Sequence, residues 1–294
     1  MRAMLRATPL LLLASCAQCA TVLQAPRVPG LALRQTLRGG YSLVNPSNTK
    51  ETFLLGDSRR ICVFEDDKAI SAAVVETVES VGKAAIEKKG AFSICVPGGS
   101  IVKALSALSK DALDFSKVHV FFCNERIGEY KCYKGAMESF IERCGIPESQ
   151  VHKVPEGDAV EVAKAYEQLV NSQPESVISK NSAGMPCMDL TLIGSGEDGH
   201  CASIHPNSAE VKATGLSKVY LPISADSKQA ITVSIDMINS SKHVIISAAG
   251  PKRKDMVATA LRVDAHDWSC PCSFIKAVDT TWLVDKESIA GFQK

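Results

Sequence analysis

The sequence predicts an α/β fold in which a mostly parallel sheet is covered by helices on both faces. Two observations predict this fold: strand-like and helix-like segments alternate from about residue 53 onward, and the connections between them are short. The content of 46% hydrophobic and 22% charged residues is ordinary for a globular protein. We therefore expect one domain, over residues 51–294.

The expected strands are short apolar runs rich in β-branched and aromatic residues. Glycine, proline or polar residues bound these runs, as is typical of buried strands in a parallel sheet. In chain order they cover residues 61–64, 92–96, 118–123, 190–193, 219–223, 230–235, 243–248 and 280–284.

The expected helices follow from apolar residues that recur at three- and four-residue steps. The clearest covers residues 68–89, which Asp66 or Asp67 can cap and Gly90 can end. The polar segment 171–188 contains glycine and proline and is expected to be a surface loop. A short helix is expected at the end of the chain, and further helices over 101–108, 133–143, 160–170 and 250–262.

The first fifty residues differ from the rest because they contain six Lys or Arg and no Asp or Glu. Residues 1–20 combine two arginines, a short leucine-rich run and small residues, which is typical of a signal peptide. Residues 21–50 are basic and interrupted by proline and glycine. Together they predict the two-part transit peptide of a secondary plastid. The alternative is a signal peptide and a linker on a secreted protein.

Nine cysteines follow residue 20. An odd number scattered through apolar segments indicates buried free thiols and favours a reducing compartment. Cys270 and Cys272 lack a second pair at ligand spacing, so no zinc site is expected. Beyond residue 50 acidic residues outnumber basic ones, so nucleic acid is not an expected partner. The apolar run in residues 1–20 is too short to span a bilayer, and no membrane association is expected of the mature protein.

The segment 190–203 carries the strongest indication of a functional site. Its strand runs into two glycines one residue apart, followed by an acid pair, a third glycine and His200. Because ligands bind at the carboxyl ends of strands in open α/β sheets, Asp198 and His200 are candidates for chemistry. Asp198 can set the tautomer of His200, which makes this histidine a candidate general base; the alternative is a structural histidine. A dinucleotide-binding loop is disfavoured because no acid follows at the required spacing.

A second strand end could bind an anion. Gly98, Gly99 and Ser100 lie between an expected strand and an expected helix. Free backbone N–H groups and the Ser100 hydroxyl would then face a phosphate placed there. The alternative is a tight turn that binds nothing.

Two arginines could also contact an anion. Arg126 ends the polar turn 124–126 after the strand over 118–123, and a guanidinium suits phosphate. Arg253 lies between two lysines at the start of a helix, where positive charge opposes the helix dipole. The alternative for Arg126 is a solvated turn with a local Glu–Arg pair. The alternative for Arg253 is a solvated helix face.

These motifs together resemble the 6-phosphogluconolactonase family, which is grouped with the glucosamine-6-phosphate deaminases. The similarity extends from about residue 52 to the C-terminus, and the glycine-acid-glycine-histidine segment is its most specific part. It implies a three-layer α/β/α fold with a mostly parallel sheet, like that of the deaminases and ribose-5-phosphate isomerase. The motifs that carry the resemblance are 97–100, 124–126, 194–206, 231–239 and 281–285.

The resemblance implies hydrolysis of 6-phosphoglucono-1,5-lactone to 6-phosphogluconate in the pentose phosphate pathway, without a metal or an organic cofactor. His200 matches the general base that activates water, and Asp198 would orient it. The loop 98–100 matches the phosphate loop, and Arg126 matches a substrate-contacting arginine. Arg253 falls where the family usually has a lysine near the phosphate. The expected partner is a sugar phosphate lactone, and the expected state is a monomer or small homo-oligomer.

The sequence departs from the family pattern at several positions. Asn124 replaces an aspartate, Cys201 a threonine, and Gln229 stands where an arginine is usual, while the stretch after Arg126 is shorter. Two alternative functions therefore stay open. One is a catalytically weak sugar-phosphate-binding protein. The other is a glucosamine-6-phosphate deaminase, whose further carboxylates would be needed where this chain has Asn124 and His205.

Overall fold

The structure is a computed structural model that describes residues 46–225, 228–262 and 266–293. The expected signal peptide over residues 1–20 lies outside the described residues. The expected transit segment over residues 21–50 also lies outside them, as far as residue 45.

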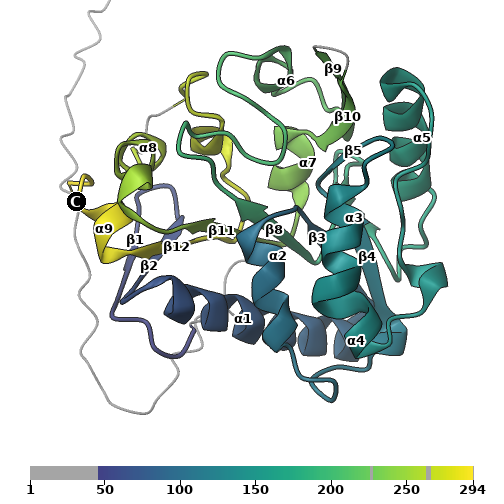
Figure 1. Ribbon diagram of the computed structural model, residues 1–294, viewed down its shortest axis with the longest axis horizontal. Coiled ribbons are helices and arrows are strands. Elements are labelled where there is room, and N and C mark those ends of the chain that lie inside the picture. The colour runs from purple at the N-terminus through teal and green to yellow at the C-terminus, as the bar shows by residue number, and fades with distance from the viewer. Residues whose placement is uncertain (1–45, 226–227, 263–265, 294) are drawn as a thin grey trace, which may run out of the picture. The chain divides into compact units, whose positions relative to one another are not determined.

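A seven-stranded sheet forms the middle layer of the domain (Figure 1). Every neighbouring pair of its strands is parallel except the pair formed by the first two strands. The predicted mostly parallel sheet is therefore confirmed. In spatial order the strands are β1 (Glu51–Leu54), β2 (Arg60–Phe64), β12 (Thr280–Asp285), β11 (His243–Ala248), β8 (Leu190–Gly194), β3 (Phe92–Val96) and β4 (Val118–Phe122).

Helices cover both faces of this sheet, which makes the three-layer α/β/α architecture. In the view of Figure 1, α1 and α2 lie below the sheet and α7 and α8 lie above it. The helices are α1 (Asp67–Lys89), α2 (Ser100–Ala104), α3 (Lys131–Ala136), α4 (Glu142–Cys144), α5 (Ala159–Asn171), α6 (Ala209–Lys212), α7 (Ile235–Ser240), α8 (Lys254–Ala260) and α9 (Lys286–Ile289). None of the helices among the described residues has the length and apolar character needed to cross a membrane.

The long helix α1 has the ends that its sequence predicts. The Asp66 carboxylate accepts a hydrogen bond from the Ala69 N–H at 2.8 Å, which satisfies one of the free donors of the first turn. Gly90 ends the helix with φ 81°, in the left-handed region where a residue without Cβ is favoured. The buried face of α1 includes Ile70, Val74 and Val78, and this face packs on the sheet.

The domain has a second sheet of three strands, and one of these strands was not predicted from the sequence. This sheet consists of β5 (Asn124–Arg126), β10 (Lys228–Val233) and β9 (Tyr220–Ala225), all antiparallel. The expectation of a polar turn over 124–126 is wrong, because these residues pair with β10. Their polarity has another cause: the buried Glu125 carboxylate accepts from the N–H groups of Cys132 and Tyr133 and so caps α3.

Smaller differences concern the ends of elements and one loop. The segment expected to be a loop over 171–188 contains a two-stranded hairpin, β6 (Ser179–Lys180) and β7 (Pro186–Cys187). The helix expected over 101–108 changes to a 3₁₀ turn at Leu105–Ala107, and the helical segment after α3 continues as a π segment over Met137–Ile141. The strand expected over 230–235 ends at Val233, because the Ser234 hydroxyl caps α7.

All nine cysteines that follow residue 20 are free and buried, as predicted. Cys95 and Cys123 lie in the core with their sulfurs 3.4 Å apart. Burial raises the pKa of Cys62 to about 11. These thiols therefore serve as small apolar groups in the core.

Candidate active site

The segments that were expected to form the site follow four neighbouring strands. The loop with Gly98 follows β3, Asn124 follows β4 after one residue, the Gly194 turn ends β8, and Gly250 follows β11 after one residue. These four strands are parallel neighbours, so their carboxyl ends meet at one edge of the sheet. The fold thus brings together segments that are far apart in the chain, as expected for an open α/β sheet.

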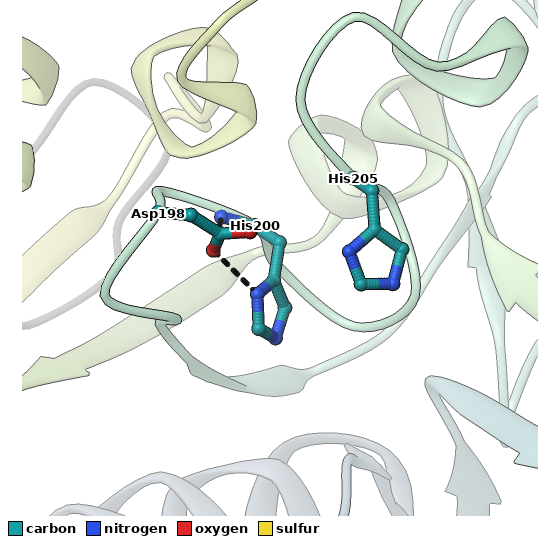
Figure 2. A group of neighbouring side chains, drawn as sticks. All are labelled: Asp198, His200 and His205. Atoms are coloured by element: carbon teal, nitrogen blue, oxygen red, sulfur yellow. Dashed lines mark hydrogen bonds and ion pairs between the residues drawn. The ribbon is translucent and has the colours of Figure 1, made fainter.

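Asp198 and His200 form a hydrogen-bonded pair in the turn after β8. Asp198 Oδ1 lies 2.6 Å from His200 Nδ1 and also accepts from the His200 backbone N–H at 3.1 Å (Figure 2). The His200 side chain is 36% exposed, so the ring is held on one side and open to solvent on the other. This is the arrangement that the sequence predicts for an oriented imidazole.

The Asp198 carboxylate is ionised at neutral pH. Partial burial works against ionisation, but hydrogen bonds from the backbone N–H and the ring of His200 outweigh it and lower the pKa of Asp198. An ionised carboxylate on Nδ1 selects the tautomer with the proton on Nδ1. The lone pair of His200 is then on Nε2, where it can accept a proton.

Two glycines of the turn leave room for this pair. A Cβ atom at Gly196 would lie 2.0 Å from His200 Nδ1 and 2.6 Å from Asp198 Oδ1, so no side chain fits there. Gly199 has φ +86°, and a Cβ there would lie 2.7 Å from the sulfur of Cys270. The glycines are therefore required by close contact with His200 and Cys270.

Asn124 contacts the loop that follows His200. Its Nδ2 donates to the Ser203 hydroxyl at 2.8 Å, and the Ser203 backbone N–H donates to the Thr232 hydroxyl at 3.2 Å. Asn124 and Thr232 are partners in the pairing of β5 with β10. The second sheet therefore holds the loop that carries His200. Sequence reasoning missed the roles of Ser203 and Thr232, because the pairing of β5 with β10 is not visible in the sequence.

The predicted anion loop lies beside the turn of β8. Gly99 has φ 86° and ψ −158°, a conformation that favours glycine, and Ser100 begins α2 with its side chain exposed. A Cβ at Gly194 would lie 3.8 Å from Ile101, so α2 packs next to the turn. Gly98 is close to Cys132 of α3, whose sulfur would lie 3.1 Å from a Cβ at this position.

Arg253 binds the same turn from the other side. Its Nε donates to the carbonyl of Ser195 at 2.9 Å, and its Nη1 donates to the carbonyl of Ala249 at 2.8 Å. These bonds link the turn after β8 to the segment after β11 and fix a positive charge there. Lys252 is exposed and forms an ion pair with Glu197 at 3.5 Å.

Arg126 was predicted to belong to the site, but its described ion pair is with Glu129 and not with Asp198. It lies on β5, two residues after Asn124, and its guanidinium forms an ion pair with Glu129 at 3.6 Å. Its side chain is about half exposed. Gln229, another departure from the family pattern, accepts from the Ala159 N–H at 2.8 Å and so binds the start of α5.

His205 lies next to His200 and was not predicted to be part of the site. The two ring centroids are 4.9 Å apart, with 38° between the planes. Figure 2 shows both rings on the same side of the loop. The five-residue spacing was visible in the sequence, but only the loop conformation brings the two rings together.

The comparisons with known proteins show the family and the fold of this chain. The model of the family described as glucosamine-6-phosphate isomerases/6-phosphogluconolactonase matches residues 65–283. The chain belongs to this family. The predicted resemblance is therefore confirmed.

Relatives within the family are named as lactonases. Probable 6-phosphogluconolactonase 4, chloroplastic, of Oryza sativa subsp. indica is 30% identical over 246 residues, which are 78% of this chain and 75% of the rice protein. Probable 6-phosphogluconolactonase 5 of Arabidopsis thaliana is 28% identical over 245 residues, which are 78% of this chain and 96% of that protein.

Solved structures share the fold of this chain. 6-Phosphogluconolactonase from Trypanosoma brucei has a TM-score of 0.67 at 24% identity, covering 79% of this chain and 98% of that one. The enzyme from Thermotoga maritima has a TM-score of 0.64 at 21% identity, covering 77% and 99%. The expected α/β/α fold of the family is thus confirmed.

Proposed function

We propose that the protein hydrolyses 6-phosphoglucono-1,5-lactone to 6-phosphogluconate in the oxidative pentose phosphate pathway. The observation that carries the proposal is the Asp198–His200 pair, 2.6 Å apart at the carboxyl end of β8. Family membership and the names of the rice and Arabidopsis relatives support the same reaction.

The proposed mechanism uses His200 as a general base. Its Nε2 accepts a proton from a water molecule while the water oxygen attacks the lactone carbonyl carbon. The tetrahedral intermediate then collapses, the bond from this carbon to the ring oxygen breaks, and His200 returns the proton to that oxygen. Asp198 keeps the ring oriented and stabilises the positive charge that His200 carries between the two steps.

The proposed phosphate site is the loop with Gly98, Gly99 and Ser100, together with Arg253. The loop offers backbone N–H groups and a hydroxyl, and Arg253 offers a permanent charge that two backbone carbonyls hold in place. Arg126 is proposed as a more peripheral substrate contact, because its side chain is half exposed and has Glu129 as its ion-pair partner.

The test is a lactonase assay of the full chain on freshly generated 6-phosphoglucono-1,5-lactone, with the spontaneous rate subtracted. His200→Ala should lower kcat by about 10²- to 10⁴-fold, the usual contribution of a general base. His266→Ala is the matched control, because the exposed His266 ring contacts Phe274 edge-on and has no role in the proposed mechanism. A wild-type protein that binds the lactone without accelerating its hydrolysis would contradict the proposal.

The same preparations test the two alternatives. Release of ammonia from glucosamine 6-phosphate would favour a deaminase. Asn124 argues against it, since its amide donates to Ser203 and cannot act as the additional carboxylate that the deaminase reaction would use at this position. Binding of 6-phosphogluconate without catalysis would favour a sugar-phosphate-binding protein.

We also propose a plastid location, which the chloroplastic rice relatives support. Residues 1–50 are proposed to be a two-part presequence, with a signal peptide over 1–20. A fluorescent reporter fused behind residues 1–50 should enter the plastid, whereas secretion of the reporter would contradict the proposal. The proposed monomer or small homo-oligomer can be measured by light scattering.

A further inference from the structure

Asp198, His200 and His205 form a cluster that contains one more imidazole than the proposed hydrolysis uses. One ligand atom from each residue can be chosen so that the three atoms lie within 4.8 Å of one another. Both rings lie on the same side of the loop (Figure 2). His205 is exposed, and it has no role in the mechanism proposed above.

We propose that these three residues bind a divalent transition-metal ion of the Zn²⁺ type, and that the bound ion inhibits the enzyme by occupying the catalytic base. Two imidazoles and a carboxylate form a donor set that zinc sites use, with a fourth position left for water. Mg²⁺ and Ca²⁺ prefer oxygen ligands and are expected to bind poorly to a site with two ring nitrogens.

The geometry requires only side-chain adjustment. Ligand bonds of about 2.0–2.2 Å place two tetrahedral ligands roughly 3.3 Å apart. If His200 binds through Nδ1, the 2.6 Å distance between Asp198 Oδ1 and this nitrogen must therefore increase slightly. Any distance between two ligand atoms that is longer than this, up to 4.8 Å, must decrease. The side chains can move in this way because Asp198 is 53% exposed, His200 is 36% exposed, and His205 is exposed.

The backbone around the cluster is already fixed. The Gly196 N–H donates to the His200 carbonyl at 2.9 Å, and the Cys272 N–H donates to the Gly199 carbonyl at 3.0 Å. His205 is held close to this turn by the paired backbone bonds between Cys201 and Ile204. Little ordering of the chain is therefore needed when the ion binds, which favours binding by a preformed site.

Inhibition follows if the ion takes a ring nitrogen of His200. A coordinated nitrogen has no lone pair for the proton of water, and a metal on the Asp198 side would also replace the hydrogen bond that orients the ring. This part of the inference rests on the proposed function. Binding of the ion does not, so the two are measured separately.

The binding test is calorimetric titration of the full chain with ZnCl₂ after treatment with a chelator. All proteins carry Cys16→Ser and Cys19→Ser, which removes the two thiols outside the described residues as competing ligands. His205→Gln and His205→Phe should weaken zinc binding at least tenfold, while His266→Gln should leave it unchanged. MgCl₂ at the same concentration should give no comparable binding.

The activity test uses the same proteins in the lactonase assay. Zinc should inhibit the parent protein over the concentration range in which it binds, and the His205 variants should keep their activity and require at least tenfold more zinc for inhibition. Equal zinc binding by the parent and both His205 variants, or no binding by the parent, would overturn the site. Zinc binding without inhibition of an active parent would overturn the inhibitory role, whereas a parent that binds zinc but has no lactonase activity would contradict the proposed function alone.

Discussion

Gly196 leaves the space that the His200 ring and the Asp198 carboxylate occupy. The backbone of the turn passes so close to the ring that a methyl group at this position would overlap Nδ1. Gly194 has the opposite environment, since a Cβ there would point to Ile101 of α2 at an ordinary contact distance of 3.8 Å. The two glycines look alike in the sequence, but of the two only Gly196 is required by the position of the His200 ring.

We predict that Gly196→Ala lowers kcat by about 10- to 100-fold, because displacing a catalytic group by about 1 Å has an effect of this size. Gly194→Ala is the matched control and should keep most of the activity. Steady-state kinetics and circular dichroism on both variants check the prediction. Equal activity of the two variants would show that the His200 ring does not depend on the space at Gly196.

The side-chain oxygen Oδ1 of Asn124 is buried and has no hydrogen-bond partner among the described residues. The other end of the amide donates to Ser203 and so holds the loop between His200 and His205. A buried acceptor without a partner costs free energy. The bond from Asn124 to Ser203 is the contribution that the structure shows.

A double-mutant cycle with Asn124→Ala and Ser203→Ala should give a coupling free energy of about 0.5–1.5 kcal/mol, the usual range for one neutral hydrogen bond. Urea unfolding of the four proteins provides the free energies of unfolding. Additive effects, with no coupling, would show that the Asn124–Ser203 bond does not hold the loop.

At the scale of the elements, a second pair of histidines lies at the edge strand β4: His119 is on the strand, and His152 follows Val151, which bridges to Val120 of β4. His119 Nδ1 lies 3.3 Å from His152 Nε2, and the His152 ring stacks on Phe121 with centroids 4.2 Å apart. Burial, followed by the charge of His119, lowers the pKa of His152 from 6.5 to about 4. Burial and the charge of Lys89 also lower the pKa of His119.

This pair predicts a loss of stability in mild acid. Between pH 6.5 and about 4 the unfolded chain binds a proton at residue 152 that the folded chain does not, so the free energy of unfolding falls as the pH falls through this window. We expect a fall of about 1–2 kcal/mol, less than for a fully buried ring because both side chains are partly solvated. Urea unfolding at pH 7 and pH 4.5 should show a smaller difference for His152→Gln than for the wild type. An unchanged difference would contradict the assignment to His152.

At the scale of the whole molecule, the core contains reduced cysteines that are closed off from solvent. The nine cysteines after residue 20 are buried, and none forms a disulfide. Burial, followed by the nearby Glu125 carboxylate, raises the pKa of Cys132 to about 12. Burial also raises the pKa of Cys270 to about 12. Thiols of this kind are poor nucleophiles because the thiolate is scarce and reagents cannot reach it.

We predict that a thiol reagent such as DTNB reacts rapidly with at most two of the eleven cysteines of the native full chain, those of residues 1–20. All eleven should react after unfolding in guanidinium chloride, which is the control for the total. Rapid reaction of a third thiol in the native protein would show that part of this core opens easily.

The sequence by itself determined most of the elements and the Asp198–His200 hydrogen bond at the end of β8. Asp66 and Gly90 fix the ends of α1, and short apolar runs fix the strands, because caps and hydrophobic periodicity act over a few residues. The Asp198–His200 pair was predictable for the same reason: both residues belong to one turn, and their bond closes over two residues.

Only the tertiary structure decided which distant segments meet at this turn. Residues 124–126 became a strand because β10, about a hundred residues later in the chain, offers them a partner; their local polarity alone indicated a turn. The contacts of Asn124 with Ser203 and of Arg253 with Ser195, and the apposition of His205 and His200, likewise depend on strand order and loop conformation. Short-range patterns do not contain this information, because the free energy of such contacts is gained only when the whole sheet has formed.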